Sequence, residues 1–179
     1  MSPGEFRSEV VPLGRKLYSF AYRFLNVREE SEDVVQEVMI RLWEKRDDLE
    51  KISSTEAFAM AMTRNICIDR LRRRKHTGGD YDINSPLISD TDLTEKIENA
   101  EAYDHIFRII SQIKEPYKTA IILRDIEGLS YEESSEITGL TVNALRVNLS
   151  RARKMVRDEM TKLYGYGSER DKRDSAKVL

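Results

Sequence analysis

The segment from Ser130 to Met160, SYEESSEITGLTVNALRVNLSRARKMVRDEM, constrains the fold of this chain most strongly. Ser130 followed by Glu133 fits a capping box at the start of a helix. Gly139 suits the left-handed residue that ends a helix, because it has no side chain to oppose that backbone conformation. Thr141 is then placed to cap a second, longer helix. The segment therefore predicts two helices joined by a tight turn.

The second of these helices has an apolar side and a basic side. Its apolar residues recur at steps of three and four and form one stripe: Val142, Leu145, Leu149, Ala152 and Val156. At about 100° per residue, the opposite face carries Asn143, Val147, Ser150 and Lys154, flanked by Arg146 and Arg151, with Arg153 nearer the stripe. A basic helix after a short capped one is typical of a helix-turn-helix that enters the DNA major groove. The alternative is an ordinary helical hairpin whose basic face is solvated and binds nothing.

The composition excludes several other classes of protein. The chain has 179 residues, 40% hydrophobic and 35% charged, and no apolar run approaches the ~20 residues of a membrane span. Cys67 is the single cysteine, and His76 and His105 lack partners at metal-ligand spacing. No Gly-rich phosphate loop or nucleophile elbow is present. We therefore expect a cytoplasmic protein that is not an enzyme, holds no metal or cofactor and does not insert into membranes.

The net charge of −2 hides a strong segregation of charge along the chain. The stretch 64–75 carries one acid, Asp69, among six cations: Arg64, Arg70, Arg72, Arg73, Arg74 and Lys75. The following stretch 77–101 is acidic, with Lys96 as its one cation. Because a phosphate backbone meets the local charge, the basic stretch remains a candidate nucleic-acid contact despite the acidic average.

Helical spacing before the basic stretch predicts a first small domain over residues 1–76. Apolar residues from Phe6 to Leu25 keep helical spacing, and Pro12 is expected to start or kink that helix. Ser31 is expected to cap the next helix. Two adjacent rows of that helix are expected to form a broad buried face: Val34, Val38 and Leu42, with Val35, Met39 and Trp43. A polar loop near residues 50–55 precedes a third helix that ends in the basic stretch.

The remainder predicts a linker, a second domain and a tail. Residues 77–96 have the composition of an acidic flexible linker. Helical spacing over 97–164 predicts a second, helix-turn-helix domain, in which Pro116 fits the first turn of a helix that Gly128 ends. Residues 165–179 lack periodicity and are expected to be a disordered tail. The predicted fold class is all-α, with two small helical domains joined by an acidic linker.

Three stretches, in this order, resemble the extracytoplasmic-function (ECF) subfamily of bacterial RNA polymerase sigma factors. ESEDVVQEVMIRLWEK resembles the helix that binds core polymerase, and FAMAMTRNICIDRLRRRK looks like the promoter-melting helix. RDIEGLSYEESSEITGLTVNALRVNLSRARK is similar to the C-terminal helix-turn-helix. The resemblance covers residues 6–160. It implies a sigma factor that binds core RNA polymerase and directs it to promoters, melting the −10 element and reading the −35 element.

The resemblance also implies roles for individual residues. The positions matching the grip on the clamp helices of the largest polymerase subunit are Asp33, Gln36 and Glu37. The positions matching the −10 contacts are Asn65 and Asp69. The expected phosphate contacts beside them are Arg70, Arg72, Arg73 and Arg74. The loop at Ile52–Thr55 would form part of a pocket for a flipped base. The expected −35 contacts are Asn143, Arg146, Val147, Ser150, Arg151, Arg153 and Lys154. By angle, Arg146 and Arg151 are expected to contact bases and Arg153 a phosphate.

Partners follow from the same resemblance: core RNA polymerase, promoter DNA and a membrane-linked anti-sigma factor. The alternative function is a free-standing helix-turn-helix transcription regulator. It would explain Ser130–Met160 but leave the outward residues of Asp33–Trp43 without a role. One departure from the family lies in the recognition helix, where many relatives have a Lys-Ser-Arg run and this chain has Arg146, Val147 and Asn148. Val147 offers only apolar contacts, such as one to a thymine methyl group.

Overall fold

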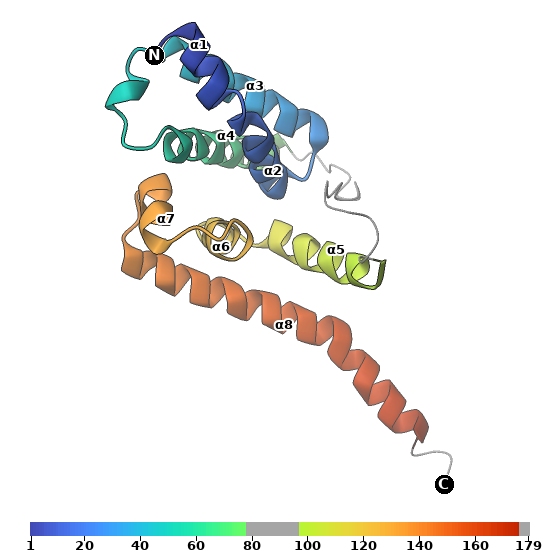
Figure 1. The fold of residues 1–179 in the computed structure, drawn as a ribbon. Coiled ribbons are helices and arrows are strands. Elements are labelled where there is room, and N and C mark those ends of the chain that lie inside the picture. The colour runs from blue at the N-terminus through green and yellow to red at the C-terminus, as the bar shows by residue number, and fades with distance from the viewer. Residues whose placement is uncertain (78–96, 176–179) are drawn as a thin grey trace. The chain divides into compact units, whose positions relative to one another are not determined.

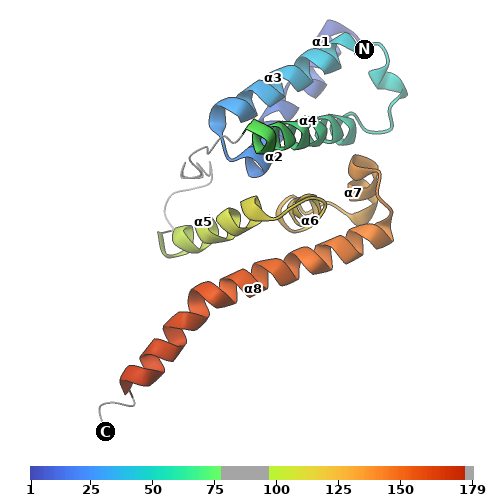
Figure 2. The same ribbon diagram turned by 180° about the vertical axis from the view of Figure 1, so that it is seen from behind.

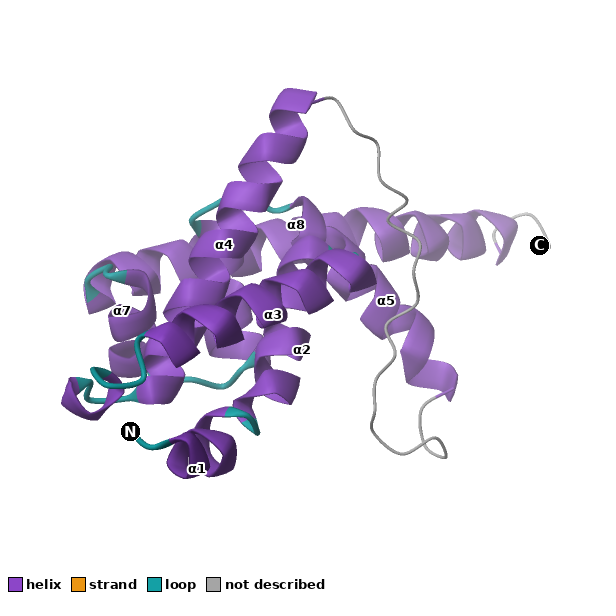
Figure 3. Ribbon diagram, turned by 90° about the horizontal axis from the view of Figure 1, so that it is seen from above, coloured by secondary structure: helices purple, strands orange, loops and turns teal. Residues whose placement is uncertain are grey.

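The computed structural model describes residues 1–77 and 97–175, with side chains for residues 1–74 and 105–163. Over these residues all regular structure is helical, as Figure 3 shows. The described residues divide into two compact units: residues 1–77 with Glu132–Leu140, and residues 97–131 with 141–175. The predicted all-α, two-domain class is confirmed. The acidic linker expected at 77–96 lies, apart from Thr77, outside the described residues.

The chain begins with three short helical segments: α1 (Pro3–Glu5), the π-helix η1 (Phe6–Val10) and α2 (Leu13–Leu25). The backbone N–H of Val11 donates to the Phe6 carbonyl at 3.2 Å, which closes the π-turn. Pro12 follows directly and has no N–H to continue the ladder. The sequence-based prediction of a break at Pro12 is therefore confirmed.

Two longer helices follow in the first unit: α3 (Arg28–Glu44) and α4 (Thr55–Thr77). Helix α2 contacts both of them, as Figure 1 shows. One row of α3 is fully buried in this packing: Val34, Val38 and Leu42. The adjacent row is turned by about 100°, and its Trp43 stays 40% exposed. The buried face of α3 is therefore narrower than the two-row face expected from the sequence.

The start of α3 also differs from the prediction. The helix begins at Arg28, after Val27 in an extended conformation (φ −137°, ψ 122°). Ser31 lies one turn inside the helix, where its buried hydroxyl donates to the Val27 carbonyl at 2.6 Å. Ser31 is therefore a back-bonding residue and no cap. The carboxylates of Glu29 and Glu30, in the first turn, complement the positive end of the helix dipole.

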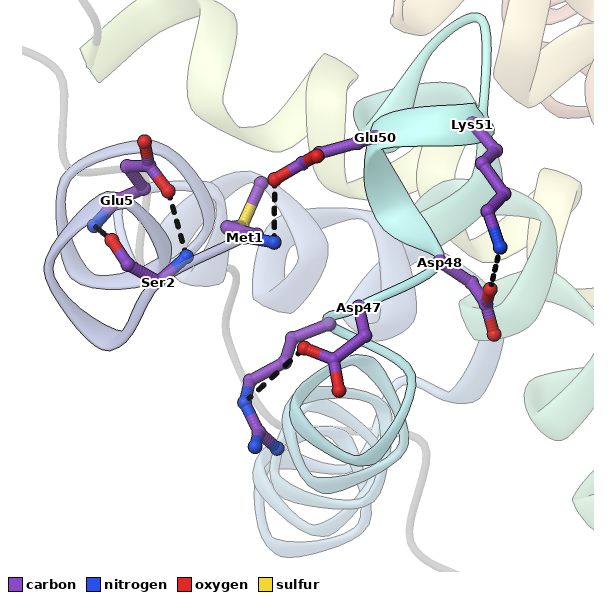
Figure 4. A network of polar contacts seen from close by, with 8 residues as sticks. Met1, Ser2, Glu5, Asp47, Asp48, Glu50 and Lys51 are labelled. Atoms are coloured by element: carbon purple, nitrogen blue, oxygen red, sulfur yellow. Dashed lines mark hydrogen bonds and ion pairs between the residues drawn. The ribbon is translucent and has the colours of Figure 1, made fainter.

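The connection between α3 and α4 contains the 3₁₀ turn η2 (Leu49–Lys51), in which Leu49 is buried and ion pairs lie on the surface. Figure 4 shows Glu50 reaching the Met1 α-amine at 2.5 Å and Lys51 contacting Asp48 at 2.6 Å. The Lys51 ammonium lowers the pKa of Asp48, mainly through their hydrogen bond. These contacts lie just before the loop at 52–54.

The second unit is built on one long helix, α8 (Val142–Ser175), which α5 (Ile97–Gln112) and α6 (Tyr117–Ile121) contact (Figures 1 and 2). The π-helix η3 (Ile122–Ile126) continues α6. The centre of the predicted α8 stripe is buried: Leu145, Leu149 and Ala152. Val142 and Val156, at its ends, are half-buried. The predicted stripe is therefore confirmed.

Two boundaries in the second unit differ from the prediction. Helix α8 continues beyond residue 164 and covers 165–175, most of the expected tail. Gly165 and Gly167 each disfavour a helix by about 1 kcal/mol relative to alanine, which is why the sequence indicated an earlier end. Pro116 lies at the N-cap position of α6, one residue before the first turn that the sequence suggested.

Candidate nucleic-acid and polymerase interfaces

The connection between α7 (Tyr131–Thr138) and α8 is the tight turn expected of a helix-turn-helix. Gly139 has φ +69°, and its N–H donates to the Ser135 carbonyl at 2.8 Å. Gly128, which ends the preceding helical segment, also has φ +69°. Thr141 accepts a hydrogen bond from the backbone N–H of Ala144 at 3.2 Å. The left-handed Gly139, the helix end at Gly128 and the threonine cap are therefore confirmed.

The outward face of α8 is exposed along the whole predicted contact surface. Its arginines are Arg146, Arg151 and Arg153, and its other members are Asn143, Val147, Ser150 and Lys154. The buried stripe occupies the other side of the helix. The residues expected to meet DNA thus face solvent without taking part in the core.

Each of the three arginines on this face contacts a residue outside α8. The guanidinium of Arg146 lies 5.2 Å from the ring centre of Tyr131. Arg151 donates to the Tyr117 hydroxyl at 3.2 Å. Arg153 binds both carboxylate oxygens of Asp125, at 2.8 and 2.6 Å. Sequence reasoning missed these partners, because Asp125 and Tyr117 precede their arginines by 28 and 34 residues.

The basic end of α4 divides into an outward and an inward set. Arg72 has 74% of its side chain exposed, and Arg73 is also exposed. The side chains of Arg70 and Arg74 are only 25% and 18% exposed. The sequence treated all four arginines alike as phosphate contacts, and the structure separates them into two kinds.

Both inward arginines join α4 to the start of α3. Arg74 pairs with the Glu30 carboxylate at 2.5 Å and donates to the Leu25 carbonyl, at the end of α2, at 3.1 Å. Arg70 donates to the Glu30 carbonyl at 3.2 Å and lies 3.7 Å from Asp33 and 3.6 Å from Glu37. Two of the three expected polymerase contacts are therefore tied electrostatically to α4.

The outward face of α3 mixes polar and apolar side chains. Asp33 and Gln36 are exposed there, and Ile40 and Trp43 follow at steps of four and three on the same side. The Trp43 ring meets Phe6 edge-on at 5.1 Å. Sequence reasoning missed Ile40 and assigned Trp43 to the core. The steps from Asp33 to Trp43 were the signal that could have found both.

The residues expected at the −10 element lie on an exposed side of α4. Asn65 and Asp69, one turn apart, are both exposed. Arg64 donates to the Asn65 side-chain oxygen at 3.1 Å, and Arg72 lies 3.5 Å from Asp69. Ser54 caps the helix by accepting the backbone N–H of Ala57 at 3.1 Å, so the loop at 52–54 leads directly into the start of α4.

Among residues 1–77 and 97–175, no three His, Cys, Asp or Glu side chains gather closely enough to hold a metal ion. Within the same residues, no helix is long and apolar enough to cross a membrane.

Comparison with known proteins places both halves of the chain. The family described as Sigma-70 region 2 matches residues 10–77, and the family described as Sigma-70, region 4 matches residues 104–156. The first match accounts for the segment that a free-standing helix-turn-helix regulator leaves without a role, so that alternative is not supported.

Two curated relatives match over most of their length. The ECF RNA polymerase sigma-E factor of Haemophilus influenzae is 30% identical over 150 residues, covering 76% of this chain and 77% of the relative. The ECF RNA polymerase sigma factor SigW of Bacillus subtilis is 28% identical over 163 residues, covering 83% and 84%.

Two solved structures share the fold. The sigma factor RpoE of Bartonella quintana, in complex with the anti-sigma factor NepR, superposes with a TM-score of 0.70 at 22% identity, covering 88% of this chain and 97% of that one. CnrH, in complex with the cytosolic domain of CnrY, gives a TM-score of 0.66 at 20% identity, covering 90% of each chain. The matched regions, their order and the relatives lead to one conclusion: this chain belongs to the extracytoplasmic-function subfamily of RNA polymerase sigma factors.

Proposed function

We propose that this chain is a promoter-specificity subunit that binds core RNA polymerase, opens the −10 element with α4 and reads the −35 element with α8. The observation that carries the proposal is the presence of region 2 and region 4 in one chain, in this order. In this proposal the chain supplies recognition, and the chemistry of RNA synthesis belongs to the polymerase.

The proposed polymerase contact is the outward face of α3. Asp33, Gln36 and Glu37 would meet the clamp helices of the largest subunit, and the exposed Ile40 and Trp43 extend the same face. A central apolar patch beside hydrogen-bonding groups is the usual anatomy of a protein interface. Asp33 and Glu37 are carboxylates and therefore favour a cationic counterpart on the polymerase, which would compete with Arg70, within 4 Å of each in the free chain.

The proposed DNA contacts lie on two helices. On α4, Asn65 and Asp69 would face the −10 bases, and the exposed Arg72 and Arg73 would meet phosphates. We assign Arg70 and Arg74 a smaller part in this contact, because their guanidinium groups already bind α3. On α8, the proposed −35 surface is Asn143, Arg146, Val147, Ser150, Arg151 and Lys154.

The proposal includes an anti-sigma partner and a cellular location. Both solved relatives described above are structures of a complex with a partner protein, named an anti-sigma factor in one case. We extend that mode of regulation to this chain, with a membrane-linked anti-sigma factor as the partner. The proposed place of action is the cytoplasm, where the polymerase works.

Transcription with purified core polymerase tests the proposal. Core enzyme with and without this chain is incubated with fragments of the source genome, and the RNA start sites are mapped. We expect discrete start sites that require the chain and share upstream sequences at −35 and −10. Binding of the chain alone to palindromic DNA, without polymerase-dependent starts, would instead favour a dimeric regulator.

A further inference from the structure

The three arginines on the outward side of α8 differ in the charge of the groups that hold them. Arg146 lies over the ring of Tyr131, and Arg151 donates to the hydroxyl of Tyr117. Both partners are neutral, so these guanidinium groups keep their full charge. Arg153 binds Asp125 through two parallel hydrogen bonds, and its charge is cancelled by the carboxylate.

The cancelled charge of Arg153 matters because DNA affinity depends on the number of phosphates that a protein neutralises. Each neutralised phosphate of duplex DNA contributes about −0.9 to the slope of log K against log salt concentration. If Arg153 moved to a phosphate, the Asp125 carboxylate would be left unpaired beside a polyanion. The bidentate geometry, which fixes both partners, also favours the existing pair.

We propose that Asp125 withholds Arg153 from the DNA backbone and thereby lowers sequence-independent binding of the second unit, leaving Arg146 and Arg151 as the charged readers. This inference rests on the proposed −35 role of α8. It replaces the sequence-based expectation that Arg153 contacts a phosphate. Asp125 is a specificity-determining residue in this view, although it lies on η3, before the helix-turn-helix.

The Arg153–Asp125 pair should affect DNA binding more than it affects the stability of the fold. The side chain of Arg153 is 54% exposed and that of Asp125 is 30% exposed, and ion pairs in contact with solvent stabilise folded proteins by about 0–1 kcal/mol. Removing one partner should therefore leave the unit folded. Its effect on DNA binding should be larger, because a full unit of charge reappears on a surface that faces a polyanion.

The test uses the full chain and a fluorescein-labelled duplex of arbitrary sequence, titrated at several salt concentrations. Asp125→Asn should bind severalfold more tightly than the wild type and steepen the salt slope by about 0.9. Arg153→Gln should weaken binding, because it leaves the Asp125 charge uncompensated. The double variant should return to the wild-type slope, since the pair is neutral in both proteins.

Two controls separate this effect from general charge and from misfolding. Asp158→Asn removes one exposed carboxylate of α8 and should change the slope by much less than Asp125→Asn. Asp125→Glu keeps the charge and should keep the wild-type slope; thermal unfolding is measured for every variant.

Three outcomes are distinguishable. If Asp125→Asn leaves the slope unchanged and the double variant matches Arg153→Gln, then Arg153 contacts phosphate directly and the inference is overturned. If Asp125→Asn binds more weakly than the wild type, Asp125 has a structural role and the inference also fails. If holoenzyme containing the wild-type chain gives no protection of the −35 element, the proposed DNA role of α8 fails instead.

Discussion

Arg74, near the end of α4, pairs with Glu30, in the first turn of α3, with 2.5 Å between Nη2 and Oε2. The same guanidinium donates to the Leu25 carbonyl at the end of α2. One side chain therefore joins three helices of the first unit. Arg74 belongs to the basic run that the sequence indicated as a DNA contact. In the structure its main role is to stabilise the packing of these helices.

The first prediction concerns this tie. Arg74→Ala should lower the free energy of unfolding by about 1–3 kcal/mol, because it leaves a partly buried carboxylate without its charged donor. Thermal unfolding followed by circular dichroism should show a melting temperature several degrees lower. Arg72→Ala is the matched control on the same helix: its side chain is 74% exposed, and its loss should change stability by less than about 0.5 kcal/mol. Equal melting temperatures for the two variants would contradict the distinction.

The second prediction compares the same two variants in promoter opening, where Arg72→Ala should have the larger effect. Arg72→Ala should weaken promoter opening by the holoenzyme evenly across sequences and lower the salt slope by about 0.7, the value for one single-strand phosphate contact. Arg74→Ala, assayed below its melting temperature, should leave that slope unchanged. Slopes are measured from open-complex formation at several salt concentrations. A lower slope for Arg74→Ala would show that its guanidinium leaves Glu30 to bind DNA.

The difference between these two arginines marks a limit of sequence reasoning. The run from Arg70 to Arg74 predicted a basic helix end, and its charge was read correctly. Which arginines turn inward depends on where Glu30 lies, and Glu30 is 44 residues away in sequence. Periodicity within one helix carries no information about such a partner.

Other differences have the same origin. The buried row of α3 was predicted because apolar spacing is a property of one helix. Exposure of Trp43 depends on how far α2 and α4 extend over that helix, which spacing cannot give. Ser31 was a reasonable cap by residue type, but the extended Val27 starts the helix earlier. The turn at Gly139 and Thr141 was predictable, because its chemistry is local.

The third prediction concerns the outward face of α3. Asp33→Ala combined with Gln36→Ala should weaken co-purification with core polymerase by about tenfold or more, the effect of losing charged hydrogen bonds worth at least 1.4 kcal/mol. Both side chains are exposed, so circular dichroism should be unchanged. Glu9→Ala with Ser19→Ala removes a carboxylate and an uncharged polar group from exposed positions on η1 and α2 and should bind normally. Unchanged binding of the Asp33 and Gln36 variant would move the polymerase contact elsewhere.

The fourth prediction separates melting from upstream recognition. Asn65→Ala should reduce opening of the −10 region, measured as permanganate reactivity of unpaired thymines, while the upstream footprint persists. Asn65 is exposed, and alanine favours a helix more than asparagine does. Its melting temperature should therefore stay the same or rise slightly. A destabilised variant, or one that opens promoters normally, would assign Asn65 a packing role.

The last prediction concerns sequence readout by α8. Arg146→Ala or Arg151→Ala should relax the preference at one base pair of the −35 element, because an arginine bidentate to guanine contributes about 1–3 kcal/mol of discrimination, or roughly ten- to hundredfold. Arg157→Ala, one turn beyond the contact surface, is the control. Selection of promoter libraries with each variant holoenzyme measures the preference at every position.

The contacts of these arginines sharpen that test. If Tyr131 orients Arg146 for a base contact, Tyr131→Leu should relax preference at the same base pair as Arg146→Ala, by a smaller factor, because the guanidinium loses its cation–π support but not its charge. A phosphate contact would not show this correspondence, since weakening it affects all sequences equally. If both variants lose promoter activity equally for all sequences, then α8 contacts the DNA backbone and specificity comes from DNA shape.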